Sequence, residues 1–213
     1  MDGHSLERSG MSINTYATLK TSVTSWLDIT AADLTSQIDD LVTIGETRIF
    51  REARTKDTET AFSIAIDGGV LPVMGDYIEL KHAYVNSSPV QVLERRNAEY
   101  IYGTYPTRSG SGVPKFIARE ANNFIFGPYP DSGYTINGVY YRRLVPLATT
   151  LHALFLNNPD LYLFACLSEA ELIIGRDDRI KIWEAKYQKI LADVNGMDRK
   201  EQASGSGLRV RIA

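Results

Sequence analysis

The spacing of apolar residues changes twice along this chain, and that change constrains the fold more than any other feature. Before Thr58, apolar residues recur every three or four positions, as they do on one face of a helix. Between Thr58 and Pro146 they alternate with small or polar residues, and after Pro146 the helical spacing returns. The sequence therefore predicts helices toward both ends of the chain and β-strands between them.

Two helices are predicted before the alternating region. The first covers residues 14–27, where one apolar stripe contains Tyr16, Leu19, Val23, Trp26 and Leu27. A break at residues 28–32 separates it from a second stripe, which runs from Ile38 to Ala53.

Two further helices are predicted after the alternating region. The first of them has a clear start signal: Asn158 suits the N-cap, Pro159 suits the first helical position, and Asp160 favours the positive end of the helix. Its predicted C-terminal cap is Gly175. The last helix is predicted to be capped by Asp177 or Asp178 and to end near residues 195–196.

The central region reads as a module of short strands. Alternation through Ile66 is followed by residues 67–69, an Asp-Gly-Gly hairpin signal. A longer run covers residues 77–85, and two short strands flank the turn pair at residues 122–123. Short strands separated by Gly and Pro turns predict a small antiparallel β-sandwich or barrel.

The chain is therefore predicted to be an α+β protein in which a discontinuous four-helix domain contains an inserted β module. The predicted parts are a flexible leader (1–13), the N-terminal helices (14–56), the β module (57–149), the C-terminal helices (150–197) and a flexible C-terminal arm (198–213). We expect the two helix pairs to pack together across the insertion.

Composition excludes several classes of protein. The 213 residues carry a formal charge of −3 and one cysteine, Cys166, so neither an internal disulfide framework nor a Cys-rich zinc module is expected. The longest apolar runs are shorter than the ~20 residues that a membrane span needs, and no secretory signal is recognised. A pI near 5.7 argues against a protein whose main role is to bind nucleic acid.

No catalytic constellation is predicted, so we expect no enzymatic activity, no cofactor and no metal. The three histidines, His4, His82 and His152, have no metal-ligand companion at short spacing. Asp76 and Glu79 could form a carboxylate pair for glycoside hydrolysis, but acid pairs of this kind are common on strands.

Two basic segments are candidate interaction sites. Arg48, Arg51 and Arg54 form an edge on the second helix, which is either a solvated face or a subunit interface. In the arm, alternation places apolar and basic residues on opposite faces: Leu208, Val210 and Ile212 against Arg209 and Arg211. Such a segment can add a strand to the sheet of a partner, although a disordered terminus is the alternative.

The order of elements and several segments resemble the head-to-tail adaptor (connector) proteins of tailed bacteriophages. The N-terminal segments are residues 16–20 through 26–27 and residues 38–49; the C-terminal ones are residues 126–130, 140–144 and 158–163, with Trp183 and Tyr187. The similarity covers most of residues 14–197, and Asp39 stands where relatives often have proline.

The resemblance implies a structural protein of the virion neck that is assembled in the host cytoplasm. Such adaptors form a homo-oligomeric ring, typically a dodecamer, which docks beneath the portal protein and carries the tail or nozzle protein. Their channel passes DNA, and a mildly acidic chain suits a conduit that does not bind DNA specifically. The resemblance also implies that the arm contacts the portal or tail.

Two other interpretations remain open at this point. A carbohydrate-binding or glycan-degrading tail component could use a tyrosine-rich β module as a stacking surface. A bacterial helical-plus-β interaction domain would show the same pattern of elements.

Overall fold

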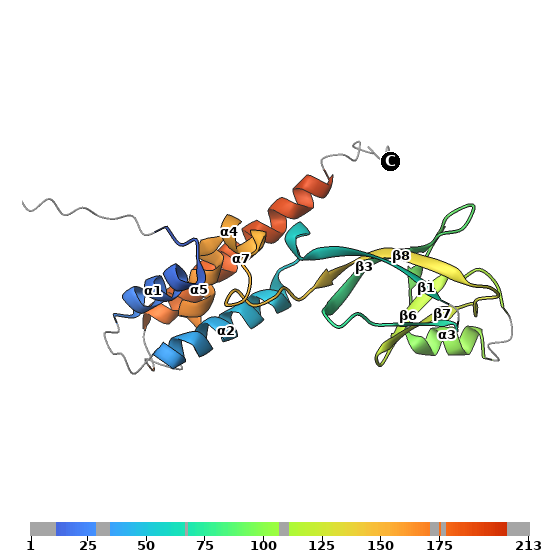
Figure 1. Cartoon of the computed structure of the whole chain (residues 1–213), viewed down its shortest axis with the longest axis horizontal. Coiled ribbons are helices and arrows are strands. Elements are labelled where there is room, and N and C mark those ends of the chain that lie inside the picture. Colours follow the sequence, from blue (N-terminus) through green and yellow to red (C-terminus); the bar gives the residue numbers. More distant parts are fainter. Residues whose placement is uncertain are drawn as a thin grey trace, which may run out of the picture. The chain divides into compact units, whose positions relative to one another are not determined.

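The computed structural model describes residues 12–28, 35–66, 68–106, 111–170, 175 and 178–203. Contacts divide the chain into two compact units, which are described separately. The helical unit combines the described residues up to Asp57 with those from Leu144 onward, and the β unit is Thr58–Arg143 (Figure 1).

The helical unit begins with the two predicted N-terminal helices, α1 (Tyr16–Leu27) and α2 (Thr35–Glu52). Thr15 starts α1 through a capping box, in which its side chain accepts from the Thr18 backbone N–H and the Thr18 side chain accepts from Thr15 in return. Asp28 ends α1 in the left-handed conformation, with φ of 56°, which turns the chain out of the helix.

Among the described residues, three further helices belong to this unit: α4 (Ala153–Asn157), α5 (Pro159–Ser168) and α7 (Asp178–Ala203). The short α4 was not predicted. Pro159 occupies the first turn of α5 as expected, but the Asn158 side chain does not cap that helix. Its Nδ2 instead donates to the Leu154 carbonyl oxygen at 3.2 Å, because Asn158 also ends α4.

Two predicted helix ends are wrong. α5 ends at Ser168, before Gly175, although Gly175 does adopt a positive φ of 70°. α7 continues past residues 195–196 to Ala203, into the predicted arm. One glycine costs a helix only about 1 kcal/mol, and good helix formers follow Gly196 in the sequence.

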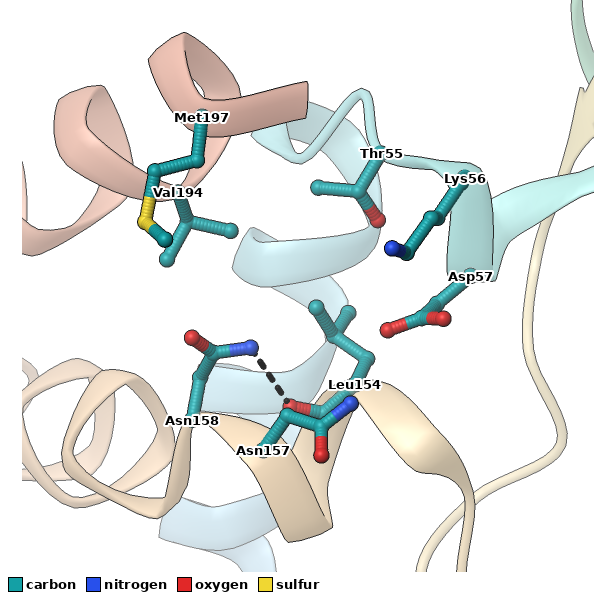
Figure 2. A pocket seen from close by; sticks show the side chains of 8 residues that line it. All are labelled: Thr55, Lys56, Asp57, Leu154, Asn157, Asn158, Val194 and Met197. Atoms are coloured by element: carbon teal, nitrogen blue, oxygen red, sulfur yellow. Dashed lines mark hydrogen bonds between the residues drawn. The ribbon is translucent and has the colours of Figure 1, made fainter. Parts of the chain in front are cut away.

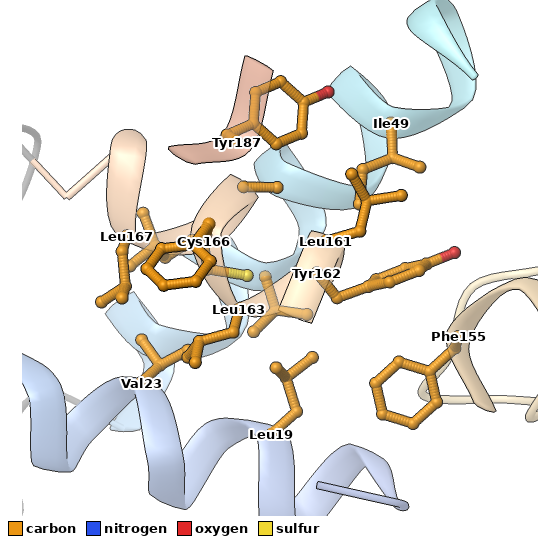
Figure 3. Packing of buried hydrophobic residues seen from close by; sticks show 14 of the residues in the cluster. Leu19, Val23, Ile49, Phe155, Leu161, Tyr162, Leu163, Cys166, Leu167 and Tyr187 are labelled. Atoms are coloured by element: carbon orange, nitrogen blue, oxygen red, sulfur yellow. The ribbon is translucent and has the colours of Figure 1, made fainter. Parts of the chain in front are cut away.

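Helix α5 forms the centre of the helical core. Its residues from Leu161 to Leu167 are all buried, as expected from apolar residues on more than one face. They pack with Leu19 and Val23 of α1, Ile49 of α2 and Tyr187 of α7, some of which are shown in Figure 3. Helices from before and after the β unit thus contribute to one apolar cluster.

Where the structure describes the β unit, it contains eight strands and one α-helix. In chain order they are β1 (Glu59–Ile66), β2 (Val70–Pro72), β3 (Tyr77–Val85), β4 (Gln91–Val92), β5 (Glu94–Arg95), α3 (Ala98–Thr104), β6 (Phe116–Glu120), β7 (Asn123–Gly127) and β8 (Tyr134–Arg142). The 3₁₀ turn Lys56–Thr58 leads into β1.

The strands form two open sheets, with orders β1-β8-β3-β4 and β2-β7-β6-β5. Neither closes into a barrel among the described residues, so of the two predicted architectures only the sandwich remains. The first sheet is antiparallel, as expected, but β5 and β6 run parallel, so the second sheet is mixed. Side chains from both sheets, including Leu80 and Phe124, form one apolar cluster.

The hairpin predicted at residues 67–69 is wrong. β1 pairs with β8 and β2 pairs with β7, so the strands on either side of this segment belong to different sheets. Gly69 adopts a φ of 70° directly against the Tyr129 ring, whose hydroxyl donates to the Gly68 carbonyl oxygen at 3.0 Å. The two glycines therefore serve a close approach and not a two-residue hairpin.

No helix among the described residues is long and apolar enough to cross a membrane.

Candidate interaction surfaces

Arg48, the first residue of the predicted basic edge, lies inside a network that joins three helices. Its Nη2 is 2.6 Å from Oε1 of Glu184 on α7, and its Nη1 is 3.0 Å from Oε1 of Glu169 at the end of α5. Its Nε is 3.4 Å from Oε1 of Glu52, and its guanidinium lies 4.3 Å from the centre of the Tyr187 ring. We call these five residues the Arg48 cluster.

The contacts of the cluster shift the pKa values of Glu184 and Tyr187. The hydrogen bond from Arg48 lowers the pKa of the Glu184 carboxyl. Burial, followed by the 2.8 Å hydrogen bond that Tyr187 donates to Glu52, raises the pKa of Tyr187. The Arg48 cluster therefore keeps α2, α5 and α7 tied together by charge-assisted hydrogen bonds.

The other two arginines of the predicted edge differ from Arg48. The Arg51 side chain is exposed. Arg54 is half-buried, and its Nη1 donates to the carbonyl oxygens of Arg51 and Ala53 at 2.9 and 3.0 Å, which satisfies the C-terminal end of α2. Of the three, Arg51 presents its charge most fully to solvent.

A second buried charge, Glu46 on α2, was not singled out from the sequence. It is 4% exposed, and its Oε1 accepts the Leu147 backbone N–H at 2.8 Å. Burial raises the pKa of this carboxyl. The position of Glu46 within an apolar helical stripe could have indicated a buried carboxyl. Its partner Leu147 could not be predicted, because it lies far along the chain.

A pocket of about 240 Å³ opens on the helical unit beside the end of α2 (Figure 2). It is lined by Thr55, Lys56, Asp57, Leu154, Asn157, Asn158, Val194 and Met197. Ligand pockets are typically ~300–1,000 Å³, so this one suits a single side chain of a partner better than a small-molecule substrate. Its lining mixes apolar and polar groups, and Met197 is 65% exposed.

The carboxylate pair considered for glycoside hydrolysis has structural contacts. Asp76 Oδ1 accepts the Tyr140 hydroxyl at 2.7 Å, and burial together with this bond raises the pKa of Tyr140 to about 12. Glu79 forms an ion pair with Arg95 at 3.8 Å. Asp76 thus holds a tyrosine of the β unit in place, whereas the ion pair of Glu79 is solvent-exposed.

The tyrosines of the β module do not gather on one face. Tyr77 and Tyr140 pack at the apolar cluster between the sheets, with ring centres 5.7 Å apart. Tyr100 and Tyr102 lie exposed on α3. A stacking surface for sugars therefore has fewer rings than the composition indicated.

The described cysteine and histidines lie in separate surroundings. Cys166 is buried, and burial raises the pKa of its thiol. His82 is exposed on β3, whereas the His152 ring packs against Phe50 and Tyr162. No group of three or more His, Cys, Asp or Glu within the described ranges could hold a metal ion.

The arm residues Leu208, Arg209, Val210, Arg211 and Ile212 lie outside the described residues, as does His4. Their predicted role therefore stays a prediction.

A known protein family matches most of this chain. The family model described as SU10 adaptor protein matches residues 14–211, which include both units. No curated protein matches the chain.

Proposed function

The chain belongs to the SU10 adaptor protein family, a family of phage head-to-tail adaptors, and we propose that it forms the ring that joins portal and tail in a virion neck. In this proposal the ring, of about twelve copies by analogy with such adaptors, docks beneath the portal protein and carries the tail or nozzle protein. It assembles in the host cytoplasm, passes DNA without specific binding and catalyses no reaction. The family match over residues 14–211 carries the proposal.

We further propose that α1, α2, α5 and α7 form one discontinuous domain with the β unit inserted. The grouping of residues on both sides of Thr58–Arg143 into one compact unit supports this arrangement. The Arg48 cluster supports it as well, because its members come from both sides of the insertion. A domain tied in this way suits a subunit that must keep its shape within a ring.

The contacts between copies and with partners are also proposals. Since Arg48 is engaged within its own chain, Arg51 is the best placed of the three arginines to meet an acidic neighbour in the ring. We propose that residues 208–212 contact the portal or tail, as their alternating pattern favours strand addition.

Electron microscopy of the purified protein mixed with its portal tests this function. We expect a ring of copies beneath the portal. Persistent monomers that do not bind the portal would contradict the proposal. In the same assay, removing residues 207–213 should weaken docking while circular dichroism shows an intact fold. Normal assembly of the truncated protein would contradict the role of the arm alone.

A further inference from the structure

Among the strands that the structure describes, none pairs with one long edge of β1, the first strand of the β unit. β1 pairs with β8 through eight registered positions, from Glu59 opposite Tyr141 to Ile66 opposite Tyr134. Because β1 ends the order β1-β8-β3-β4, no strand within the described ranges pairs with its other edge. Backbone groups on such an edge are available to an added strand.

The other three sheet edges are short. β4 and β5 have two residues each, and β5 consists of the charged pair Glu94 and Arg95. β2 has three residues and ends in Pro72, which has no N–H to donate. Short, charged or proline-containing edges discourage pairing, whereas β1 has eight residues, no proline and no charge after Glu59.

The side chains of β1 define what an added strand must carry. Ala61, Ser63 and Ala65 are exposed on one face. On the other face, Phe62 and Ile64 pack against the apolar cluster of the β unit but are only half-buried. An added strand with apolar residues at alternate positions would extend this cluster and cover both side chains.

The exposed face has room for long side chains. Ala61 and Ser63 line a hollow of about 390 Å³ together with Tyr84, Asn137 and other residues of β3 and β8. A strand next to β1 could therefore carry large polar residues on this face.

The chain itself contains a segment of this chemistry. After the linker at residues 204–207, residues 208–213 alternate apolar residues with Arg209 and Arg211. The apolar set, Leu208, Val210 and Ile212, would lie beside Phe62 and Ile64, and the arginines would lie beside the small residues of β1. Six residues cover most of an eight-residue strand.

We propose that, in protein not bound to portal or tail, the free edge of β1 binds residues 208–213 of a second copy as an added strand. This inference rests on the proposed ring, in which each copy meets the next through unlike surfaces. An arm on one copy and a strand edge on the next form such a head-to-tail contact, and repetition closes a ring. Many such weak contacts reinforce one another.

Disulfide cross-linking between two differently tagged copies tests the contact directly. One copy carries Ser63→Cys and the other carries Arg209→Cys or Arg211→Cys, while the buried Cys166 stays in place. We expect a cross-linked heterodimer with at least one arginine position. Val210→Cys is the matched control, because its side chain would lie on the opposite face and should not cross-link. Cross-linking of Val210→Cys alone, or of no position, would overturn the proposal.

Hydrogen exchange gives a second readout in the full chain. Val210→Pro in the arm should make those amides of residues 59–66 that point away from β8 exchange about tenfold faster, whereas Ser206→Pro in the linker should leave them protected. Dilution should also remove protection of the unmodified protein, since the strand comes from another copy. Protection that is independent of both Val210→Pro and concentration would refute the inference.

These results are separable from the proposed function. If rings form under the portal while β1 shows no arm-dependent protection, the adaptor role stands and this contact does not exist. If β1 is protected by the arm but no ring binds the portal, the adaptor role fails and the contact stands.

Discussion

The helical unit and the β unit both bury an apolar cluster, yet they differ in what they leave at its border. In the helical unit, charged groups near the cluster meet partners of the same chain, as Arg48 does with three carboxylates and Glu46 with a backbone N–H. In the β unit, Phe62 and Ile64 stay half-buried along the free edge of β1. The helical unit thus meets its border charges within the chain, whereas the β unit leaves apolar side chains partly uncovered at one strand edge.

The largest effects are expected when one buried side chain is truncated in the core of either unit. Leu161→Ala in the helical cluster should lower the free energy of unfolding by about 2–5 kcal/mol, and Phe124→Ala in the β cluster by about 3–5 kcal/mol. Both tryptophans, Trp26 and Trp183, belong to the helical unit. The denaturation midpoint followed by tryptophan fluorescence should therefore shift with Leu161→Ala and stay unchanged with Phe124→Ala. The loss of stability from Phe124→Ala should instead appear as faster hydrogen exchange of the β-strand amides.

The control for this experiment is Leu156→Ala, since Leu156 is 52% exposed and its loss should change stability by less than about 0.5 kcal/mol. Equal shifts of fluorescence from Leu161→Ala and Phe124→Ala would mean that the two units unfold as one.

A smaller effect is expected from overfilling the β unit. A Cβ at Gly138 would lie 2.5 Å from the His82 carbonyl oxygen and 2.6 Å from the Phe62 ring, so Gly138→Ala should destabilise by about 1–3 kcal/mol. A Cβ at Gly103 on α3 would meet no atom within 4 Å, so Gly103→Ala should be neutral or stabilising by up to about 1 kcal/mol. Thermal unfolding checks both, and a neutral Gly138→Ala would show that the sheet adjusts.

The Arg48 cluster tests how much the paired charges at the edge of the helical cluster contribute to stability. Arg48→Met should cost about 1–2 kcal/mol, because three carboxylates lose a charged donor but can regain some water. Arg51→Met is the matched variant, with an expected change below about 0.5 kcal/mol. Urea denaturation measures both. Equal losses would contradict the distinction between an engaged and an exposed arginine.

The smallest effects are those of pH, and they have opposite signs for two carboxyls. Burial raises the folded pKa of Glu46, so ionisation of Glu46 weakens the fold as pH rises above its unfolded value of about 4.3. Glu46→Gln should thus be more stable than the native chain at pH 7, and the gain should vanish near pH 4. Because Arg48 lowers the pKa of Glu184, that carboxyl stabilises above about pH 4.3, and its contribution is lost as pH falls through its folded pKa.

Glu184→Gln should accordingly cost stability at pH 7, and the cost should shrink in acid. Free energies of unfolding measured across pH 3.5–7 would show the two variants diverging from the native chain in opposite directions. Parallel curves would contradict the assigned pKa shifts.

The sequence predicted elements well where the signal is local. The period of apolar residues identified α1, α2 and the long strand β3, and Pro159 marked the start of α5. It missed what depends on distant partners. Glu184, which binds Arg48, lies on another helix. β1 and β2 lie in different sheets because β1 pairs with the distant strand β8.

The candidate sites were harder to predict for the same reason. A basic edge at three-residue spacing looks uniform in sequence, but Arg48 and Arg51 differ because only Arg48 faces α5 and α7. Whether a strand lies at an edge follows from sheet order, which local alternation does not encode.

The helical cluster contains residues from before and after the β unit, and this has a consequence during synthesis. The apolar stripes of α1 and α2 emerge from the ribosome before α5, their main packing partner, has been made. At about 5–20 residues per second, translation of Thr58–Arg143 takes on the order of ten seconds. The β unit cannot be completed earlier, because β8, which pairs with both β1 and β3, is its last strand. The first two helices must therefore wait with their apolar faces exposed, and a chaperone that binds such faces would act at this stage.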